Sequence, residues 1–214
     1  MRRNVFALLF CLSSLIVPMR ALAGAYDEIL VAARDNRGDV VIDLVQRGMD
    51  VNTSDRAGTT LLMLAARNGN DQLLEFLLSK RANVLKQNKY GDTAIGLAAL
   101  KGSLPIVRRL VGAGADISSR GWNALHYAAF NGHTEVVRFL VSSKGVVLDS
   151  PAPNRQTALM LAARNGHKEV VRILIEADAD MDIDDGQGHT ALSLARNAGN
   201  TEIADYLRRE GAVE

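Results

Sequence analysis

The sequence has almost no cysteine, few aromatic residues and no excess of charge of one sign. Of its 214 residues one is cysteine, four are proline and 5% are aromatic. The single cysteine, Cys11, has no partner for an intramolecular disulfide, so we expect stability to come from packing. The formal net charge is +1, which gives no general attraction to nucleic acid or to an acidic membrane surface.

The start of the chain has the pattern of an export signal. The basic pair Arg2-Arg3 precedes an apolar run from Val5 to Val17. That run is about 13 residues long, which is short for a helix that spans a bilayer. The small-x-small pattern Ala21-Leu22-Ala23 is typical of a cleavage site. We therefore predict a secretory signal peptide over residues 1–23, cleaved before Gly24, with an uncleaved membrane anchor as the alternative.

Groups of side chains that bind metals or carry out catalysis are missing as well. The chain has four histidines, and no two of them have the i, i+4 spacing of a zinc-binding helix. His133 and His167 each follow a glycine at matching points of the chain, which favours a structural role in a loop. The glycines are dispersed and form no phosphate-binding loop. We therefore predict no cofactor, no metal site and no enzymatic activity.

What the sequence does contain is one pattern repeated along most of its length. A threonine or asparagine recurs at intervals of about 33 residues, a period typical of stacked repeat arrays. Four of these residues are followed by a pair of alanines, and each copy then has a glycine. The recurring residues are Thr60, Thr93, Asn123, Thr157 and Thr190, with Ala65-Ala66, Ala98-Ala99, Ala128-Ala129 and Ala162-Ala163, and with Gly69, Gly102, Gly132, Gly166 and Gly199.

Each copy predicts two short helices that follow a turn. The side-chain oxygen of Thr60 caps the first helix by accepting a hydrogen bond from a backbone N–H of the first turn. The alanine pair keeps this helix thin, so that the next copy packs closely against it. Gly69 ends the helix in the left-handed conformation. Leucines at helical spacing, such as Leu73 and Leu77, then build the second helix.

These units resemble the ankyrin repeat. The matching patterns are Asp-x-x-Gly-x-Thr at 55–60 and Ala-Leu-His-x-Ala-Ala-x-x-Gly-His at 124–133. The resemblance extends over residues 26–214, and it implies an all-α solenoid of helix–turn–helix units with β-hairpin fingers. The chain departs from the family pattern in two respects: no proline follows the capping residue, and Met63, Gly96 and Met160 replace the family's histidine.

The register of the repeats predicts one ankyrin-repeat domain over residues 24–214. A degenerate terminal unit at 26–54 comes first, and we expect Asp27 to cap its first helix. In the last unit Arg196 and Arg208 occupy positions that are small or apolar in the other units. We interpret that unit as a polar C-terminal cap. The four full repeats span about 55–87, 88–118, 119–151 and 152–184, and the cap repeat spans 185–214.

The resemblance also implies where a partner binds. In ankyrin arrays the finger tips and the exposed ends of the first helices line a concave face that holds other proteins. Aromatic and arginine residues gather near the middle of that face here, as they do in protein-binding hot spots. The alternative is that Trp122 and Phe130 pack on each other to cover a shortened third finger. The predicted protein-binding residues are Arg67, Tyr90, Asp92, Leu100, Lys101, Trp122, Phe130, Asn131, Arg164 and Asn165.

The signal and the repeats together predict a secreted, periplasmic and monomeric protein that binds another protein. The leading hypothesis is a scaffold that stabilises an enzyme in stress defence. The alternative is an inhibitor or immunity protein that occludes a toxic periplasmic enzyme, and an enzyme is disfavoured because catalytic groups are missing. We expect neither nucleic acid nor, after cleavage, a membrane as partner.

Overall fold

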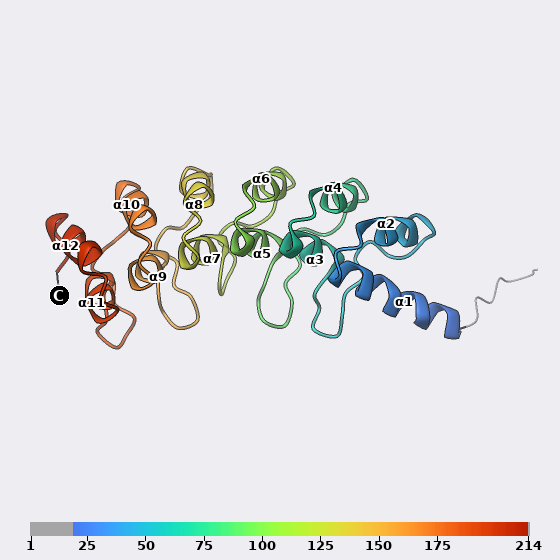
Figure 1. The fold of residues 1–214 in the computed structure, drawn as a ribbon, viewed down its shortest axis with the longest axis horizontal. Helices are drawn as coiled ribbons and strands as arrows, with labels where there is room; N and C mark the ends of the chain where they lie inside the picture. Colours follow the sequence, from blue (N-terminus) through green and yellow to red (C-terminus); the bar gives the residue numbers. More distant parts are fainter. Residues whose placement is uncertain (1–18, 214) are drawn as a thin grey trace, which may run out of the picture.

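The computed structural model describes residues 19–213, and residues 1–18 of the predicted signal lie outside that range. Within it the protein consists of twelve α-helices in successive pairs, without a β-strand. Figure 1 shows an elongated array, with the even-numbered outer helices in one row and the odd-numbered inner helices in a second row. The predicted all-α repeat array is confirmed. The helices are α1 (Met19–Arg34), α2 (Gly38–Gln46), α3 (Leu61–Asn68), α4 (Asp71–Ser79), α5 (Ala94–Lys101), α6 (Leu104–Gly112), α7 (Ala124–Phe130), α8 (Thr134–Val141), α9 (Ala158–Arg164), α10 (Lys168–Glu176), α11 (Ala191–Asn197) and α12 (Thr201–Arg209).

Each inner helix from α3 to α11 begins at the side chain that the sequence predicts as its cap. Thr60 Oγ1 accepts a hydrogen bond from Met63 N at 3.2 Å, and Asn123 Oδ1 accepts one from His126 N at 3.0 Å. His126 Nδ1 accepts a hydrogen bond from the Asn123 N–H at 3.2 Å. At the other cap the Thr60 N–H meets only the Met63 thioether sulfur, at 3.5 Å. These two reciprocal bonds between the cap and the third helical residue form a capping box. Because sulfur is a weak acceptor, the bond to Met63 is the weaker of the two in the box of Thr60. Thr93, Thr157 and Thr190 form the same kind of cap.

The alanine pairs bring neighbouring inner helices into close contact. Ala65, Ala99, Ala128 and Ala162 have 0% exposure. Because an alanine side chain ends at Cβ, the backbones of adjacent repeats approach closely, and the larger residues of the outer helices fill the layer behind them. The buried apolar residues form one continuous cluster from the first helix to the last. The described part of the chain therefore has a single core that runs along the whole array.

Side chains also tie most of the inner helices to the one before. Asn131 Nδ2 and His133 Nε2 both lie within hydrogen-bond distance of the Leu100 carbonyl, at 3.0 and 2.9 Å. A carbonyl only accepts, so His133 carries a proton on Nε2 and donates it. The last carbonyls of a helix lack partners within the helix, and these bonds, which we call the carbonyl ladder, satisfy them. The ladder recurs from Asn165 and His167 to Phe130, from Asn68 to Ala33, and from Asn200 to Ala163 and Arg164.

The contact between α3 and α5 lacks this ladder within residues 19–213. Lys101 and Ser103 stand there in place of the asparagine and the histidine, and neither donates a side-chain hydrogen bond to α3. The Lys101 stem instead lies over the end of α3, where a Cβ added to Gly69 would meet Lys101 Cε at 3.7 Å. Gly69 has a φ of 74°, which glycine adopts at low cost. Contact between α3 and α5 therefore depends on apolar packing.

The loops before the inner helices, which we call fingers, are not confirmed as β-hairpins. One isolated antiparallel bridge, between Ser54 and Thr60, is the only β pairing among the described residues. Four fingers are instead closed by a backbone hydrogen bond from the first residue to the fifth, such as Asp55 N to the Thr59 carbonyl at 3.1 Å. A loop this short leaves no room for a ladder of strand pairs. The other closures are Asn88 to Asp92, Ala152 to Gln156 and Asp185 to His189.

The two ends of the array differ from the sequence-based expectation in one respect. The prediction that Asp27 caps the first helix is wrong, because α1 begins at Met19 and continues past it. The good helix formers methionine, alanine and leucine upstream extend the helix, across the predicted cleavage site before Gly24. Cleavage itself stays a prediction. At the other end Arg196 and Arg208 are exposed, as a polar cap requires.

Candidate functional site

Three of the fingers, the first, second and last, are held by the side chain of their first residue. Asp55 Oδ1 accepts hydrogen bonds from Ala57 N at 2.8 Å and Thr59 N at 3.0 Å. Asparagine and aspartate readily form such bonds to the backbone two residues on. Burial by itself raises the pKa of the Asp55 carboxyl, but the backbone bonds and the Arg34 side chain outweigh burial and hold the pKa below its usual value. Asn88 and Asp185 fix the second and last fingers in the same way.

Asp92, which the sequence analysis predicts as a binding residue, uses both of its carboxylate oxygens for hydrogen bonds within the repeat array. One of its carboxylate oxygens accepts a hydrogen bond from the Tyr127 hydroxyl of α7, and the other accepts one from Asn88 Nδ2 at 3.0 Å. Burial and then the neighbouring Asp92 carboxylate raise the pKa of Tyr127 well above its usual value. Tyr127 therefore stays protonated and links the second finger to the following repeat.

The third finger, residues 119–122, carries an aromatic cluster that packs on itself. Trp122 lies edge-on to Phe130, with ring centroids 5.5 Å apart and an interplanar angle of 74°. Its centroid is 5.2 Å from that of Tyr127 and 6.1 Å from that of His126. These are the separations of favourable aromatic pairs. Of the two interpretations of Trp122 and Phe130, the geometry supports packing over the shortened finger.

Three further predicted residues also serve the scaffold. Asn131 and Asn165 donate in the carbonyl ladder, and Leu100 is partly buried against the core. The remaining residues of the predicted set, Arg67, Tyr90, Lys101 and Arg164, form no hydrogen bond or ion pair through their side chains among the described residues. The structure therefore divides the predicted site into a supporting group and a smaller group that is free to meet a partner.

Tyr90 is the most exposed large apolar side chain of the described residues, at 71%. It stands in the second finger, where Asn88 Oδ1 accepts a hydrogen bond from its backbone N–H at 2.9 Å. Lys89 Nζ lies 4.9 Å from the centroid of the Tyr90 ring, which is a cation–π contact. An aromatic ring is thus presented to solvent on a backbone that is fixed.

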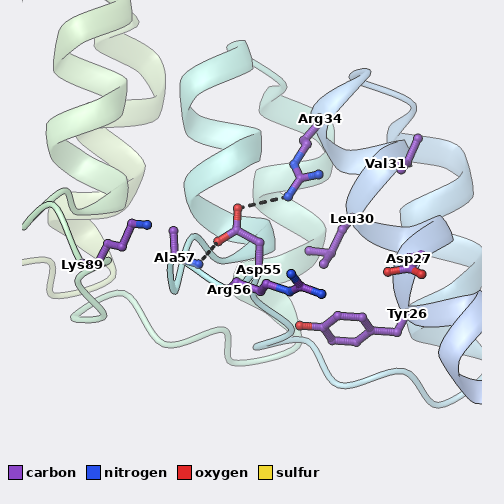
Figure 2. Close-up of a pocket in the computed structure, with 9 residues that line it drawn as sticks. All are labelled: Tyr26, Asp27, Leu30, Val31, Arg34, Asp55, Arg56, Ala57 and Lys89. Carbon is purple, nitrogen blue, oxygen red and sulfur yellow. Dashed lines mark hydrogen bonds and ion pairs between the residues drawn. The ribbon is translucent and has the colours of Figure 1, made fainter.

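Sequence reasoning missed the N-terminal end of this face. Figure 2 shows the Tyr26 side chain extending from α1 toward the first finger and Arg34 of α1 reaching Asp55, among the residues that line a groove of about 470 Å³ together with Val31, Arg56 and Lys89. Tyr26 and Val31 are 41% and 43% exposed, and the Tyr26 hydroxyl donates to the carbonyl before Asp55. A helix predicted to begin at Asp27 leaves Tyr26 outside it. The recurring Ala-Ala-Arg of 32–34 and 65–67 was a signal that could have found Arg34.

Other kinds of site were also sought in the part of the chain that the structure describes. No group of three or more His, Cys, Asp and Glu side chains there is arranged to hold a metal ion. Over the same residues, no helix combines the length and the apolar character that crossing a bilayer requires. The exposed fingers and the ends of the inner helices thus remain the candidate functional site.

Comparison with known proteins identifies the repeat. A family model of ankyrin repeats, in three copies, matches residues 29–120, 62–152 and 145–213. The chain is 30% identical over 184 residues to the nuclear factor NF-kappa-B p105 subunit of Gallus gallus, which covers 85% of this chain and 16% of that protein. It is 48% identical over 44 residues to the Notch-regulated ankyrin repeat-containing protein A of Danio rerio, which covers 19% of this chain and 39% of that protein. The human protein of that name gives the same identity over the same length. The matched regions thus make up less than half of these relatives.

Proposed function

This chain belongs to the ankyrin-repeat family, and on that premise we propose that it is a scaffold that binds a partner protein on its fingers and inner-helix ends. Ankyrin repeats are protein–protein interaction modules. The observation that carries the proposal is Tyr90, an aromatic side chain 71% exposed on a finger that Asn88 fixes. A ring held in this way loses little conformational entropy on binding, and tyrosine is enriched in binding hot spots.

The contact set is narrower than the sequence predicts. Asp92, Asn131 and Asn165 hold the scaffold, so replacing them would disturb folding as well as binding. Tyr90 and Arg67 are exposed and hold nothing in place. Binding contributions are therefore best measured at these two residues.

The experiment compares two exposed apolar residues at opposite parts of the array. We expect Tyr90→Ala to weaken binding of a captured partner about tenfold or more, which corresponds to loss of a hot-spot side chain. Val213→Ala is the matched control, because Val213 is 59% exposed beyond α12, and it leaves affinity unchanged. Calorimetric titration of each variant with the purified partner provides the measurement. Equal affinities of the two variants would contradict a partner site at the second finger.

Within this proposal the partner is a periplasmic enzyme that the scaffold stabilises in stress defence. The support is the export signal pattern at residues 1–23, and intact residues 1–23 on exported protein, detected by mass spectrometry, would contradict cleavage before Gly24. An inhibitor or immunity protein binding the same face is the second candidate. Adding the scaffold to its purified partner separates the two, because a stabiliser preserves the partner's activity and an inhibitor abolishes it.

A further inference from the structure

Charges are segregated between the two layers of the array. The inner helices α3, α5, α7, α9 and α11 contain no aspartate or glutamate. The outer helices α4, α8, α10 and α12 each contain at least one. The nearly neutral net charge of the chain thus conceals an outer layer that holds many of the acids and, from α3 onward, inner helices without them; α1 carries Asp27 and Glu28, and α6 of the outer layer has no acid.

The outer layer neutralises its own charge. Arg109 Nε lies 2.9 Å from Asp71 Oδ1, which joins α6 to α4. Arg138 Nη2 lies 3.2 Å from Glu169 Oε1, which joins α8 to α10, and Arg172 also pairs with Glu169. Exposed ion pairs contribute little to stability. Their consequence here is that Arg109, Arg138 and Arg172 already have carboxylate partners, while Arg108 lies over the Phe139 ring.

The acids of the fingers are also engaged. Asp55 accepts from two backbone N–H groups and lies 3.1 Å from Arg34 Nη2. Asp92 accepts from Tyr127 and Asn88. The few finger carboxylates that approach the inner layer therefore do not pair with its remaining cations.

A set of basic side chains along the fingers and inner-helix ends also lacks carboxylate partners, and we call this set the basic stripe. Its members lie on finger loops or at the ends of inner helices, and none forms an ion pair among residues 19–213. Figure 2 shows two of them, Arg56 and Lys89, on the fingers beside the N-terminal groove. The basic stripe consists of Arg56, Arg67, Lys89, Lys101, Arg120 and Arg164.

We propose that the basic stripe binds an acidic, extended segment of the partner protein. This inference rests on the proposed function and names the chemistry of the partner. Packed helices lie about 8–10 Å apart, and an extended chain advances about 3.3 Å per residue. A carboxylate at roughly every third residue therefore meets one repeat after another. Complementary charge of this kind speeds association and selects the partner.

A protein segment fits this surface better than a nucleic acid does. The stripe carries one or two cations per repeat, whereas a nucleic acid strand carries a phosphate at every nucleotide and is neutralised by dense basic clusters. At the C-terminal end of the array the last finger exposes Asp184, whereas Asp185 is buried within the finger. A long polyanion that followed the array would meet Asp184, whereas a short acidic segment ends before it.

The test uses fluorescence anisotropy with a labelled peptide of about six Glu-Gly-Ser triplets, which places a carboxylate at every third residue. A Lys-Gly-Ser peptide of the same length and an oligothymidine are the comparison probes. We expect the acidic peptide to bind, to bind more weakly as salt is added, and to lose at least tenfold in affinity with Arg67→Glu/Lys101→Glu. The matched control is Lys80→Glu/Lys144→Glu, which changes net charge equally at exposed positions outside the stripe. It is expected to lose less than twofold.

Two results with the peptide and oligothymidine probes would overturn the inference. One is equal affinity of the two double variants for the acidic peptide, and the other is tighter binding of oligothymidine than of that peptide. Thermal melting of both variants confirms that they are folded. A partner that is lost with Tyr90→Ala but is bound unchanged by Arg67→Glu/Lys101→Glu would also overturn the acidic segment while leaving the protein-binding function intact. If neither Tyr90→Ala nor Arg67→Glu/Lys101→Glu weakened binding of the partner, the result would contradict the proposed function itself.

Discussion

The second and third fingers each carry one aromatic residue, Tyr90 three positions before the cap Thr93 and Trp122 directly before the cap Asn123, and the two side chains do different things. Tyr90 is 71% exposed and its ring contacts Lys89. Trp122 lies against Phe130, Tyr127 and His126. The second finger keeps its backbone closure, whereas the third is shorter and its aromatic ring turns onto the following helix. The length of the finger and the position of the ring within it together determine whether the aromatic residue is available to a partner or packs on the following helix.

The same two regions differ in how their repeats are joined. The carbonyl ladder ties α7 to α5 and α9 to α7, but α5 contacts α3 without it. The inner helix that follows Tyr90 is thus joined to the preceding inner helix by apolar packing, although Lys89 N bonds the Ala57 carbonyl at 2.8 Å and Arg109 of α6 pairs with Asp71 of α4. The comparison separates inner-helix contacts that have the carbonyl ladder from the α3–α5 contact that lacks it.

Overpacking the inner helices gives the largest expected effect and sharpens this comparison. Ala162 of α9 has 0% exposure, and ladder bonds join α9 to both of its neighbours. We expect Ala162→Leu to lower the free energy of unfolding by about 3 kcal/mol, because the tied helices cannot move apart. The matching Ala98→Leu in α5 should lower the free energy of unfolding by less, because no ladder bond ties α5 to α3 and the two helices can move apart. Urea denaturation measures both, and a larger loss at Ala98 would contradict the assignment of the weaker contact.

Removing the packed ring gives the next largest effect. Trp122→Ala should cost about 2 kcal/mol of stability, less than loss of a fully buried ring, because Trp122 is only half-buried. Affinity per folded molecule should be unchanged. Tyr90→Ala should show the reverse, with stability within about 0.5 kcal/mol of the parent and weakened binding. Thermal melting and calorimetric titration on both variants test this. If Trp122→Ala weakened binding without loss of stability, Trp122 would be a binding hot spot and not a packing residue.

Much of the fold could be predicted from the sequence because its signals are local and recur. The capping oxygen of Thr60, the paired alanines and the closing glycines each specify a short-range feature, and repetition fixes their register. The start of α1 could not be placed in this way. Asp27 is a good capping residue, but the helix formers before it let α1 begin at Met19.

The candidate site was less predictable because the same surface positions serve two purposes. Asp92 and Asn131 lie at finger and helix-end positions that the family pattern implies for binding, but their partners are groups of the neighbouring repeat. Those partners are about 30 residues away in sequence, one repeat period, and only the stacked structure brings them together. The segregation of charge was hidden for the same reason, since it depends on which layer each residue occupies.

A smaller effect is expected from cutting the ladder at the centre. His167→Ala removes the donor that lies 2.9 Å from the Phe130 carbonyl, although Asn165 still bonds that oxygen. We expect a loss of about 1 kcal/mol, the usual net value of one hydrogen bond. Asn197→Ala is the control, because Asn197 is exposed at the end of α11. Denaturation midpoints provide the measurement, and equal midpoints would show that the ladder contributes nothing to stability.

The smallest expected effect, and the most direct test of the comparison, comes from building the ladder where it is missing. In Lys101→Asn/Ser103→His the new side chains occupy the positions of Asn131 and His133, which bond the Leu100 carbonyl. The corresponding carbonyl of α3 is that of Arg67. Gly69 leaves room for the imidazole, as Gly102 does for His133, where an added Cβ would lie only 2.6 Å from the His133 ring. We expect a gain of about 0.5–1 kcal/mol, because the carbonyl exchanges water for protein donors. Hydrogen exchange should slow in the last turn of α3 and leave α9 unaffected. If the double variant is no more stable than the parent, the weakness of the α3–α5 contact does not arise from the missing ladder.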